Sequence, residues 1–308
     1  MIERVNDEVQ KRFGVQPTAF LGGRCNRHWL VERKAEQLVL RRWAVSFDSI
    51  VYEVRLLEQV AALGWSVAPV VAGPFEVDGA FWSLSPFIRG EPMATHDVAD
   101  EQRVRGRFLA MLHRDTAQIR DIGQRKPWRR CEEILSDESL DCVLAENETK
   151  YPQEIGILRW HLDHARERVL GLPLQHRPGI IVHGDFTTWN LRFTAGHLSG
   201  ILDFELAHYD HRIADFALSW RGKYDAVIHG YNEVTPLESE EWQFLTPMWW
   251  AFLIEGICHD LAKGGWMMAG LFGRYCGVRP LWEQMRESFS QPNGYNRHRA
   301  CVEPYRPV

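Results

Sequence analysis

The 308-residue chain lacks any long run of apolar residues. No segment offers eighteen uncharged apolar residues in a row, and the first fourteen residues, MIERVNDEVQKRFG, predict a charged helix rather than a signal sequence. A basic stripe is also missing, and the formal net charge is −5. We therefore expect a cytoplasmic protein whose partners include neither a membrane nor a nucleic acid.

Cysteines are few and scattered through the sequence. The six stand at positions 25, 131, 142, 258, 276 and 301, without a CxxC pair or the spacing of a metal site. Reduced thiols in a cytoplasmic protein are the simplest interpretation. Internal repeats and low-complexity linkers are absent too. With 45% hydrophobic residues, the chain can bury a substantial core and divide into two lobes, as a monomer or a homodimer.

One polar cluster carries most of the functional information. The sequence reads HGDFTTWN over residues 183–190, and ILDFE follows over residues 201–205. The spacing H-x-D-x-x-x-x-N, followed by D-F, is the catalytic-loop arrangement of phosphoryl-transfer enzymes. Asp185 can accept a proton from an attacking hydroxyl, while Asn190 and Asp203 can offer oxygen ligands to Mg²⁺.

Short apolar segments surround this cluster. Residues 179–182 (GIIV) predict a buried strand that ends at His183. Residues 191–193 and 198–202 predict two further strands joined by a turn, and this hairpin would bring Asp203 beside Asn190. An isolated aspartate or asparagine in a loop is most often a turn former or a cap. The flanking strands therefore favour a catalytic interpretation over that simpler one.

The amino-terminal part of the chain predicts a β-rich lobe. Strands are expected over residues 18–21, 28–32, 37–41, 67–73 and 79–85. A turn containing Gly22 and Gly23 joins the first two, and paired glycines let backbone N–H groups approach phosphate oxygens closely. A glycine-rich hairpin turn without a ligand has the same pattern. An amphipathic helix is expected to start at residues 47–49.

These motifs resemble the aminoglycoside phosphotransferase and choline kinase superfamily, a group of small-molecule kinases. The resemblance rests on HGDxxxxN and ILDFExA, in which Gly184 stands where protein kinases carry arginine. The GGxxN turn at residues 22–26 and the LAMLH segment at residues 109–113 are similar to the family as well. Residues 210–212 depart from it, because Asp-His-Arg replaces the usual Gly-Asp-Pro and puts the local turn geometry in doubt.

The resemblance implies an α+β, two-lobed protein-kinase-like fold. A nucleotide-binding lobe with a five-stranded antiparallel sheet would cover residues 1–89, and a mostly helical catalytic and acceptor-binding lobe would cover residues 90–308. Helices are expected over residues 103–113, 155–170 and 237–264, the last rich in aromatic residues that usually pack in a core. The tail from Gln291 is expected to be irregular.

The cofactors implied by the resemblance are ATP, or another nucleoside triphosphate, and Mg²⁺. Arg41 would anchor the phosphates where protein kinases use lysine, and its partner would be Glu53, with Glu58 as the alternative. Solvated charges on a strand and a helix are the simpler interpretation of this pair. The residues implied for nucleotide binding are Gly22, Gly23, Asn26, Arg41, Glu53, Ser85 and Phe87, the last two at the expected adenine-binding hinge.

Several residues near the cluster have secondary roles in this interpretation. His183 is expected to organise the loop by hydrogen bonding, because Asp185 already serves as the base. Glu205 could reach a second metal through water or stabilise the loop, and the sequence leaves both open. Asp215 is expected to be a structural acid at a helix start, and His113 a satisfied core histidine.

The predicted activity is transfer of the γ-phosphoryl group of ATP to a hydroxyl of a small molecule. An antibiotic, aminoglycoside-type or otherwise hydroxylated, is the first expectation for the acceptor, which would confer resistance. A metabolic kinase acting on homoserine, choline or a related amino alcohol is the alternative, and FELAHYD at residues 204–210 resembles that branch at least as well. A nucleotide-binding regulator without catalysis is disfavoured by the intact polar cluster. Candidate acceptor contacts are Glu233, Glu255, His259 and Asp260.

Overall fold

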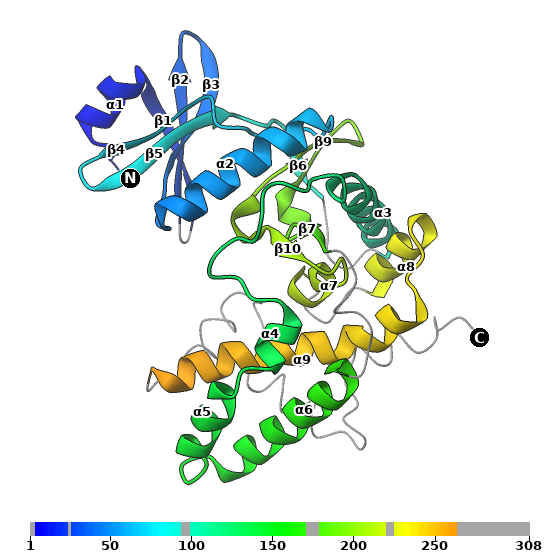
Figure 1. Ribbon diagram of the computed structural model, residues 1–308. Helices are drawn as coiled ribbons and strands as arrows, with labels where there is room; N and C mark the ends of the chain where they lie inside the picture. Colours follow the sequence, from blue (N-terminus) through cyan, green and yellow to red (C-terminus); the bar gives the residue numbers. More distant parts are fainter. Residues whose placement is uncertain (1–3, 24–25, 94–98, 171–178, 220–224, 264–308) are drawn as a thin grey trace. The chain divides into compact units, whose positions relative to one another are not determined.

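The computed structural model describes residues 4–23, 26–93, 99–170, 179–219 and 225–263 (Figure 1). The chain forms two compact units, each discontinuous in sequence. Unit 1 comprises Met1–Thr95, Asp115–Pro127 and Asp185–Tyr209, and unit 2 comprises His96–Arg114, Trp128–Gly184 and Asp210–Val308. Most of the predicted phosphoryl-transfer residues therefore belong to unit 1.

Unit 1 is built on an antiparallel five-stranded sheet with the strand order β1-β2-β3-β5-β4. The strands are β1 (Gln16–Gly22), β2 (Arg27–Arg33), β3 (Glu36–Arg42), β4 (Ala72–Val77) and β5 (Ala80–Pro86). Side chains alternate between the two faces, so Trp29 and Val31 of β2 are buried together with Leu38 and Leu40 of β3. The predicted five-stranded antiparallel sheet is confirmed.

The predicted position of the fourth strand is wrong. The apolar run over residues 67–73 predicts a strand there, but β4 begins at Ala72 and ends at Val77. Pro69 lacks the N–H group that a strand would need, and Gly73 has a φ of +91°, which interrupts the pairing with β5. The apolar residues before Ala72 therefore form a loop instead.

Two helices belong to unit 1. Helix α1 (Asp7–Phe13) begins after Asn6, whose side chain accepts a hydrogen bond from the Glu8 N–H at 2.8 Å. Helix α2 (Phe47–Ala62) begins after Ser46, which caps the Ser49 N–H, and it buries Glu53 among apolar residues. This confirms the helix predicted to start at residues 47–49.

The segment after residue 179 forms the predicted strands. Strand β7 (Ile180–Val182) ends at His183, and β8 (Leu191–Thr194) and β9 (His197–Ile201) form a hairpin. The short strand β6 (Glu91–Pro92) pairs with β8 and completes a three-stranded sheet. Short 3₁₀ helices η2 (Thr188–Asn190) and η3 (Phe204–Leu206) and a strand β10 (His208–Asp210) complete this region.

Unit 2 is mostly helical. Its helices are α3 (Ala99–Thr116, whose last two residues are assigned to unit 1), α4 (Cys131–Leu135), α5 (Ser139–Asn147), α6 (Pro152–Leu170), α7 (Ala214–Ser219), α8 (Asp225–Val234) and α9 (Ser239–Ala262). Helix α9 packs against α4, α5, α6 and α7. Trp242, Phe244 and Trp250 of α9 are buried, so its aromatic residues form core packing, as predicted. The described cysteines, Cys131, Cys142 and Cys258, are free.

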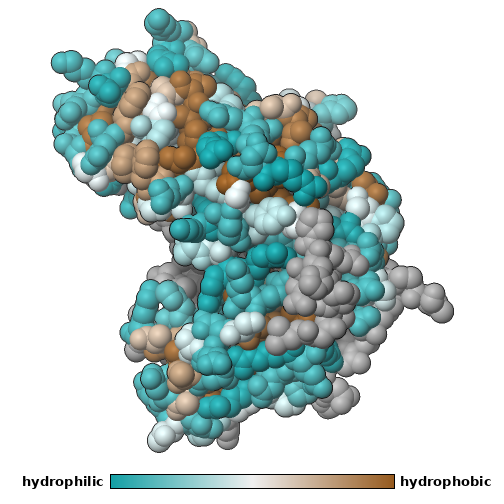
Figure 2. Space-filling model, in the orientation of Figure 1, coloured by the Kyte–Doolittle hydropathy of each residue, from teal (hydrophilic) through white to brown (hydrophobic). Residues whose placement is uncertain are grey.

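The surface drawn in Figure 2 is mostly hydrophilic. It carries scattered hydrophobic patches, and the exposed large apolar residues of unit 1 include Leu21, Phe47, Val71 and Phe75. Isolated exposed apolar side chains are ordinary on protein surfaces. No helix among the described residues combines the length and the apolar character needed to cross a membrane.

Candidate active site

The loop between β7 and β8 brings Asp185 and Asn190 into direct contact. The Asn190 amide donates to the Asp185 backbone oxygen at 2.8 Å and to its carboxylate Oδ2 at 3.1 Å. The Thr187 N–H also donates to the Asp185 backbone oxygen, at 2.8 Å. Because the amide nitrogen of Asn190 faces Asp185, its Oδ1 is the atom with which Asn190 could bind a cation.

Asp203 is returned to this loop by the β8–β9 hairpin. The Leu202 N–H donates to the Asn190 backbone oxygen at 2.8 Å, and Leu191 pairs with Ile201. Asp203 itself has a φ of +64°, in the left-handed region that few non-glycine residues adopt. Asp203 is exposed as a residue. Partial desolvation of its carboxylate, followed by the negative charge of Glu205, raises the pKa of Asp203 to about 7.

These residues fit a divalent cation bound together with phosphates. Among the described residues, no group of three or more His, Cys, Asp or Glu side chains could hold a metal without help. Mg²⁺ is commonly bound through one or two protein carboxylates, with phosphate and water oxygens supplying the remaining ligands. A cation at Asp203 would also favour the ionised carboxylate, which desolvation and the charge of Glu205 disfavour. Asn190 and Asp203 could therefore hold Mg²⁺ on a nucleotide.

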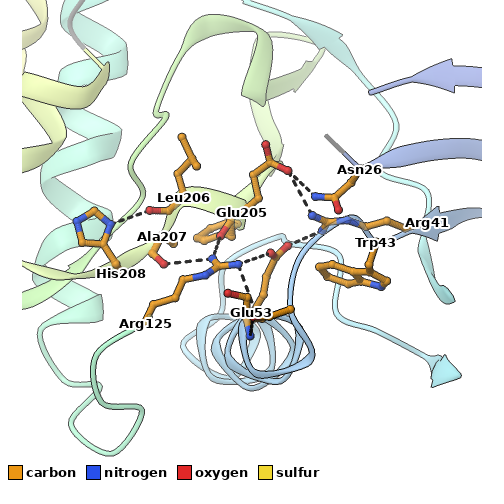
Figure 3. Close-up of polar contacts among 12 residues, drawn as sticks. Asn26, Arg41, Trp43, Glu53, Arg125, Glu205, Leu206, Ala207 and His208 are labelled. Atoms are coloured by element: carbon orange, nitrogen blue, oxygen red, sulfur yellow. Dashed lines mark hydrogen bonds and ion pairs between the residues drawn. The ribbon is translucent and has the colours of Figure 1, made fainter. Parts of the chain in front are cut away.

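The predicted ion pair between β3 and α2 is present (Figure 3). Arg41 Nη1 donates to Glu53 Oε1 at 2.5 Å, and Glu53 is only 1% exposed. The alternative partner, Glu58, is exposed. The Arg41 guanidinium also lies over the Trp43 ring, 3.7 Å from its centroid. Its Nε and Nη2 are buried and make no hydrogen bond within the described part of the chain. Phosphate oxygens would satisfy such donors well.

The glycine turn after β1 is braced by Asn26. A Cβ on Gly23 would lie 2.0 Å from the Asn26 backbone oxygen, and the φ of Gly23 is +116°, so only glycine fits there. The Asn26 side chain is 1% exposed; it donates to Glu205 Oε2 at 2.5 Å and accepts from the Ala44 N–H at 2.9 Å. Residues 24–25 of the turn lie outside the described residues. Gly22, also at positive φ, ends β1.

Glu205 links the turn after Asp203 to the nucleotide-binding part of unit 1. Besides accepting from Asn26, its carboxylate lies 3.6 Å from Arg41 Nη2. Of the two roles that the sequence leaves open, loop stabilisation has direct contacts in the structure, and a metal-linked role stays a prediction. At the predicted hinge, the Phe87 N–H donates to the Gln37 backbone oxygen at 3.4 Å, and Ser85 of β5 pairs with Val39 of β3. Their contact with adenine also stays a prediction.

Within unit 2, Asp215 fixes the backbone that precedes Asp185. Its carboxylate accepts hydrogen bonds from the His183 and Gly184 N–H groups, both at 2.7 Å, and contacts His113 Nε2 at 2.8 Å. Burial opposes ionisation, but His113 and these backbone donors hold the pKa of Asp215 below its usual value. Asp215 is thus the predicted structural acid. His113, which also contacts the Tyr231 hydroxyl at 3.0 Å, is a buried core histidine, as predicted.

The unusual segment at residues 210–212 makes its own set of contacts in unit 2. His211 Nε2 lies 2.5 Å from Glu132 Oε1 and 2.7 Å from Arg130 Nη2. Arg212 donates to both carboxylate oxygens of Glu241, at 2.6 and 2.5 Å. The turn is therefore held by side chains of α9 and of the segment at the start of α4, without the usual Gly-Asp-Pro.

The four candidate acceptor residues differ in their surroundings. Glu233 pairs with two arginines of α3, at 2.6 and 2.7 Å, and Glu255 pairs with Arg129 at 2.5 Å. His259 is exposed and Asp260 is buried on α9. Their contact with substrate stays a prediction.

Sequence reasoning misses Arg125, which is 2% exposed. Arg125 lies in a segment without helix or strand, and it contacts Glu53 as well as the turn after Asp203 (Figure 3). Nothing in the local sequence distinguishes this buried arginine from a surface one, because its partners are more than 70 residues away in the chain.

Comparison with curated proteins gives no match. Solved structures do match over nearly the whole chain. An aminoglycoside phosphotransferase from Alicyclobacillus acidocaldarius has a TM-score of 0.65 at 13% identity, covering 94% of this chain and 91% of that chain. Spectinomycin phosphotransferase APH(9)-Ia, in complex with ADP and spectinomycin, has a TM-score of 0.60 at 14% identity, covering 96% and 97%.

Amicoumacin kinase, in complex with AMP-PNP, Ca²⁺ and its ligand Ami, has a TM-score of 0.62 at 14% identity, covering 96% of this chain and 97% of that chain. At these identities the similarity concerns the fold, and it confirms the predicted α+β kinase-like architecture. The model of the phosphotransferase enzyme family matches residues 17–236, which is more than half of the chain. The protein therefore belongs to the phosphotransferase enzyme family.

Proposed function

We propose that this protein transfers the γ-phosphoryl group of ATP to a hydroxyl of a small molecule in a Mg²⁺-dependent reaction. The observation that carries the proposal is the arrangement of Asp185, Asn190 and Asp203 at the two ends of the β8–β9 hairpin in unit 1. The same unit contains the Arg41–Glu53 pair with its unsatisfied buried donors. A proton acceptor, oxygen ligands for a cation and a phosphate-binding cation are the groups that phosphoryl transfer requires.

The proposed mechanism assigns proton handling to Asp185. The Asn190 amide donates to one oxygen of the Asp185 carboxylate. The Asp215 carboxylate accepts from the N–H groups of His183 and Gly184, the two residues before Asp185. The Asp185 carboxylate would orient the acceptor hydroxyl and accept its proton as the new P–O bond forms, while the bond between the γ-phosphorus and the bridging oxygen breaks and ADP leaves. When bound, Mg²⁺ would neutralise negative charge on the nucleotide phosphates. Positioning and charge neutralisation would supply most of the rate enhancement.

Arg41 is proposed to bind the nucleotide phosphates. Its contact with Glu53 is 2.5 Å long, whereas its contact with the partly exposed Glu205 is 3.6 Å long. We expect an incoming phosphate to displace the looser partner, Glu205, and to leave the buried Glu53 in place. The Gly22–Gly23 turn would then cover the phosphates with backbone N–H groups. Residues 1–89 would accordingly serve as the nucleotide-binding lobe and residues 90–308 as the catalytic and acceptor-binding lobe.

A hydroxylated antibiotic is the acceptor we propose, with resistance as the biological role. The support is that spectinomycin phosphotransferase and amicoumacin kinase share this fold and were solved with their antibiotic ligands. A cytoplasmic location would suit a reaction that uses ATP and a chain whose described cysteines are free. Homoserine, choline and related amino alcohols are the alternative acceptors.

A coupled ADP-release screen tests the acceptor assignment. The purified protein, with ATP and Mg²⁺, is presented with aminoglycosides, spectinomycin, other hydroxylated antibiotics, homoserine and choline. We expect acceptor-dependent ADP release with at least one antibiotic, and a product heavier by one phosphoryl group. Release with homoserine or choline alone would contradict the antibiotic assignment while leaving the kinase chemistry intact.

A further inference from the structure

One buried arginine links helix α2 to the turn that carries Asp203. Arg125 Nη1 donates to the backbone oxygens of Phe204, at 2.9 Å, and Ala207, at 3.3 Å. Its Nη2 donates to Glu53 Oε2 at 3.2 Å and to the Ser49 backbone oxygen at 3.3 Å (Figure 3). A single guanidinium therefore contacts both ends of η3 and two successive turns of α2.

The carboxylate of Glu53 is shared between two arginines. Its Oε1 accepts from Arg41 on β3, and its Oε2 accepts from Arg125. Glu53 is 1% exposed and Arg125 2% exposed, so neither charge has water as a substitute partner. Arg125 thus fixes the position of Glu53, and through Glu53 that of Arg41.

Arg125 supports the turn after Asp203 in addition to the bonds that the turn makes itself. Asp203 has a positive φ, and η3 is a single 3₁₀ turn closed by an Ala207 N–H bond to the Phe204 oxygen at 3.1 Å. Arg125 supplies donors to the carbonyls at both ends of this turn. Only arginine offers several donors in a planar fork, and lysine, with a compact ammonium, does not reproduce that geometry.

The segment around Arg125 is itself attached to α2. The Ser49 hydroxyl donates to the Lys126 backbone oxygen at 3.2 Å, and the Arg125 guanidinium lies 5.5 Å from the centre of the Tyr52 ring. The backbone that carries Arg125 is therefore itself bound to α2 within unit 1.

We infer that Arg125 is a positioning residue for the nucleotide and its cation, because it holds both the Asp203 turn and the Arg41–Glu53 pair. Asp203 would carry the cation and Arg41 the phosphates, so loss of Arg125 would disturb both contacts at once. The cation and nucleotide roles rest on the function proposed above.

The test compares Arg125→Gln, Arg125→Lys and Arg125→Ala in the full chain. The matched control is Arg120→Gln, which removes an exposed arginine from the same segment. Binding of Mg²⁺ with AMP-PNP is measured by calorimetry, and backbone hydrogen exchange is measured over residues 203–207 without ligand. We expect Arg125→Gln to bind Mg²⁺–AMP-PNP about tenfold to a hundredfold more weakly, the usual effect of losing a group that orients metal ligands.

Two further readouts separate positioning from general destabilisation. Exchange over residues 203–207 should accelerate in Arg125→Gln, while exchange in β1 and β2 stays at the wild-type rate. Millimolar methylguanidinium should restore part of the Mg²⁺–AMP-PNP affinity of Arg125→Ala. It should leave the Mg²⁺–AMP-PNP affinity of Arg120→Gln unchanged. Arg125→Lys should remain weaker than wild type although its charge is kept.

Wild-type affinity together with wild-type exchange in Arg125→Gln would overturn the inference. If neither Arg125→Gln nor Arg125→Ala folds, the same two measurements on Arg125→Lys decide, and wild-type values there would overturn it. Failure of the proposed function has a different signature: a wild-type protein that phosphorylates no acceptor. Exchange over residues 203–207 still tests the positioning role in that case, because it needs neither nucleotide nor acceptor.

Discussion

The Asn190 side chain binds Asp185 twice, through the backbone oxygen at 2.8 Å and through carboxylate Oδ2 at 3.1 Å. One amide group thus fixes both the loop conformation and the orientation of the proposed base. The neighbouring backbone contact, from Leu202 to Asn190, places the residue before Asp203 against the same loop. Base and cation ligands therefore belong to one local structure, and the contact of Asn190 with the Asp185 backbone oxygen does not depend on the Asp185 side chain.

Replacement of Arg41 should weaken ATP use more than it slows the chemical step. Arg41→Lys keeps the charge but loses the forked donors, and Arg41→Met loses both. Because hydrogen bonds to charged groups contribute about 1.5–3 kcal/mol, we expect the KM for ATP to rise roughly tenfold to a hundredfold in Arg41→Met. Arg41→Lys should fall between Arg41→Met and wild type.

Steady-state kinetics with ATP as the varied substrate measures this effect. Arg42→Lys is the matched control, because Arg42 is the exposed neighbour on the same strand. An unchanged KM for ATP in Arg41→Met would argue against a phosphate-binding role for this residue.

Asp203 should make the metal-free protein less stable as the pH rises. Partial desolvation of its carboxylate and the negative charge of Glu205 raise the pKa of Asp203 to about 7 in the folded protein, against an ordinary value of 3.8. Between these values the folded state holds a proton that the unfolded state has released. The contribution of protonated Asp203 to the free energy of unfolding is therefore fully present below about pH 4, and it is lost as the pH rises through 7.

Asp203→Asn does not titrate and should escape this loss. Its Tm, measured without Mg²⁺, should rise relative to that of wild type between pH 5 and pH 8, by an amount that solvent screening at this exposed position keeps small. Added Mg²⁺ at pH 8 should stabilise the wild type more than the variant. Parallel pH profiles for the two proteins would contradict the assignment of Asp203 as a carboxylate whose pKa is raised in the folded, metal-free protein.

Loss of the Asp215 carboxylate should destabilise unit 2. Asp215→Ala leaves two buried N–H groups and His113 without their partner, and an unsatisfied buried hydrogen-bonding group typically costs about 1–3 kcal/mol. Denaturant unfolding measures the effect. Asp163→Asn, at an exposed position of α6, is the control and should unfold as the wild type does. Equal stability of Asp215→Ala and wild type would refute the structural role.

Local patterns in the sequence predict most of the fold. Alternating apolar residues identify β2 and β3, and a serine before an apolar helical stripe marks the start of α2. The catalytic hairpin is equally visible, because its strands and turn are adjacent in the chain. The predicted position of β4 is wrong because Pro69 and Gly73 interrupt an apolar run that otherwise has the pattern of a strand.

Contacts between distant segments are what the sequence does not reveal. Asn26 and Glu205 are 179 residues apart, and Arg125 is 72 residues from Glu53. In sequence, Asn26 belongs to a glycine turn expected to meet phosphate, whereas in the structure both ends of its side chain are already engaged. Such pairings depend on tertiary packing, for which neither periodicity nor spacing is a guide.

The central claim is that Asp185 is the base of a phosphotransferase, and single-substitution kinetics test it most directly. The measurement follows transfer of the γ-phosphoryl group from ATP to whichever acceptor the screen identifies, in wild type and in Asp185→Asn, alongside calorimetric binding of Mg²⁺–AMP-PNP. We predict that Asp185→Asn lowers kcat by roughly 10²–10⁴-fold, the usual contribution of a general base, while nucleotide affinity changes little. Wild-type turnover in Asp185→Asn would contradict the account.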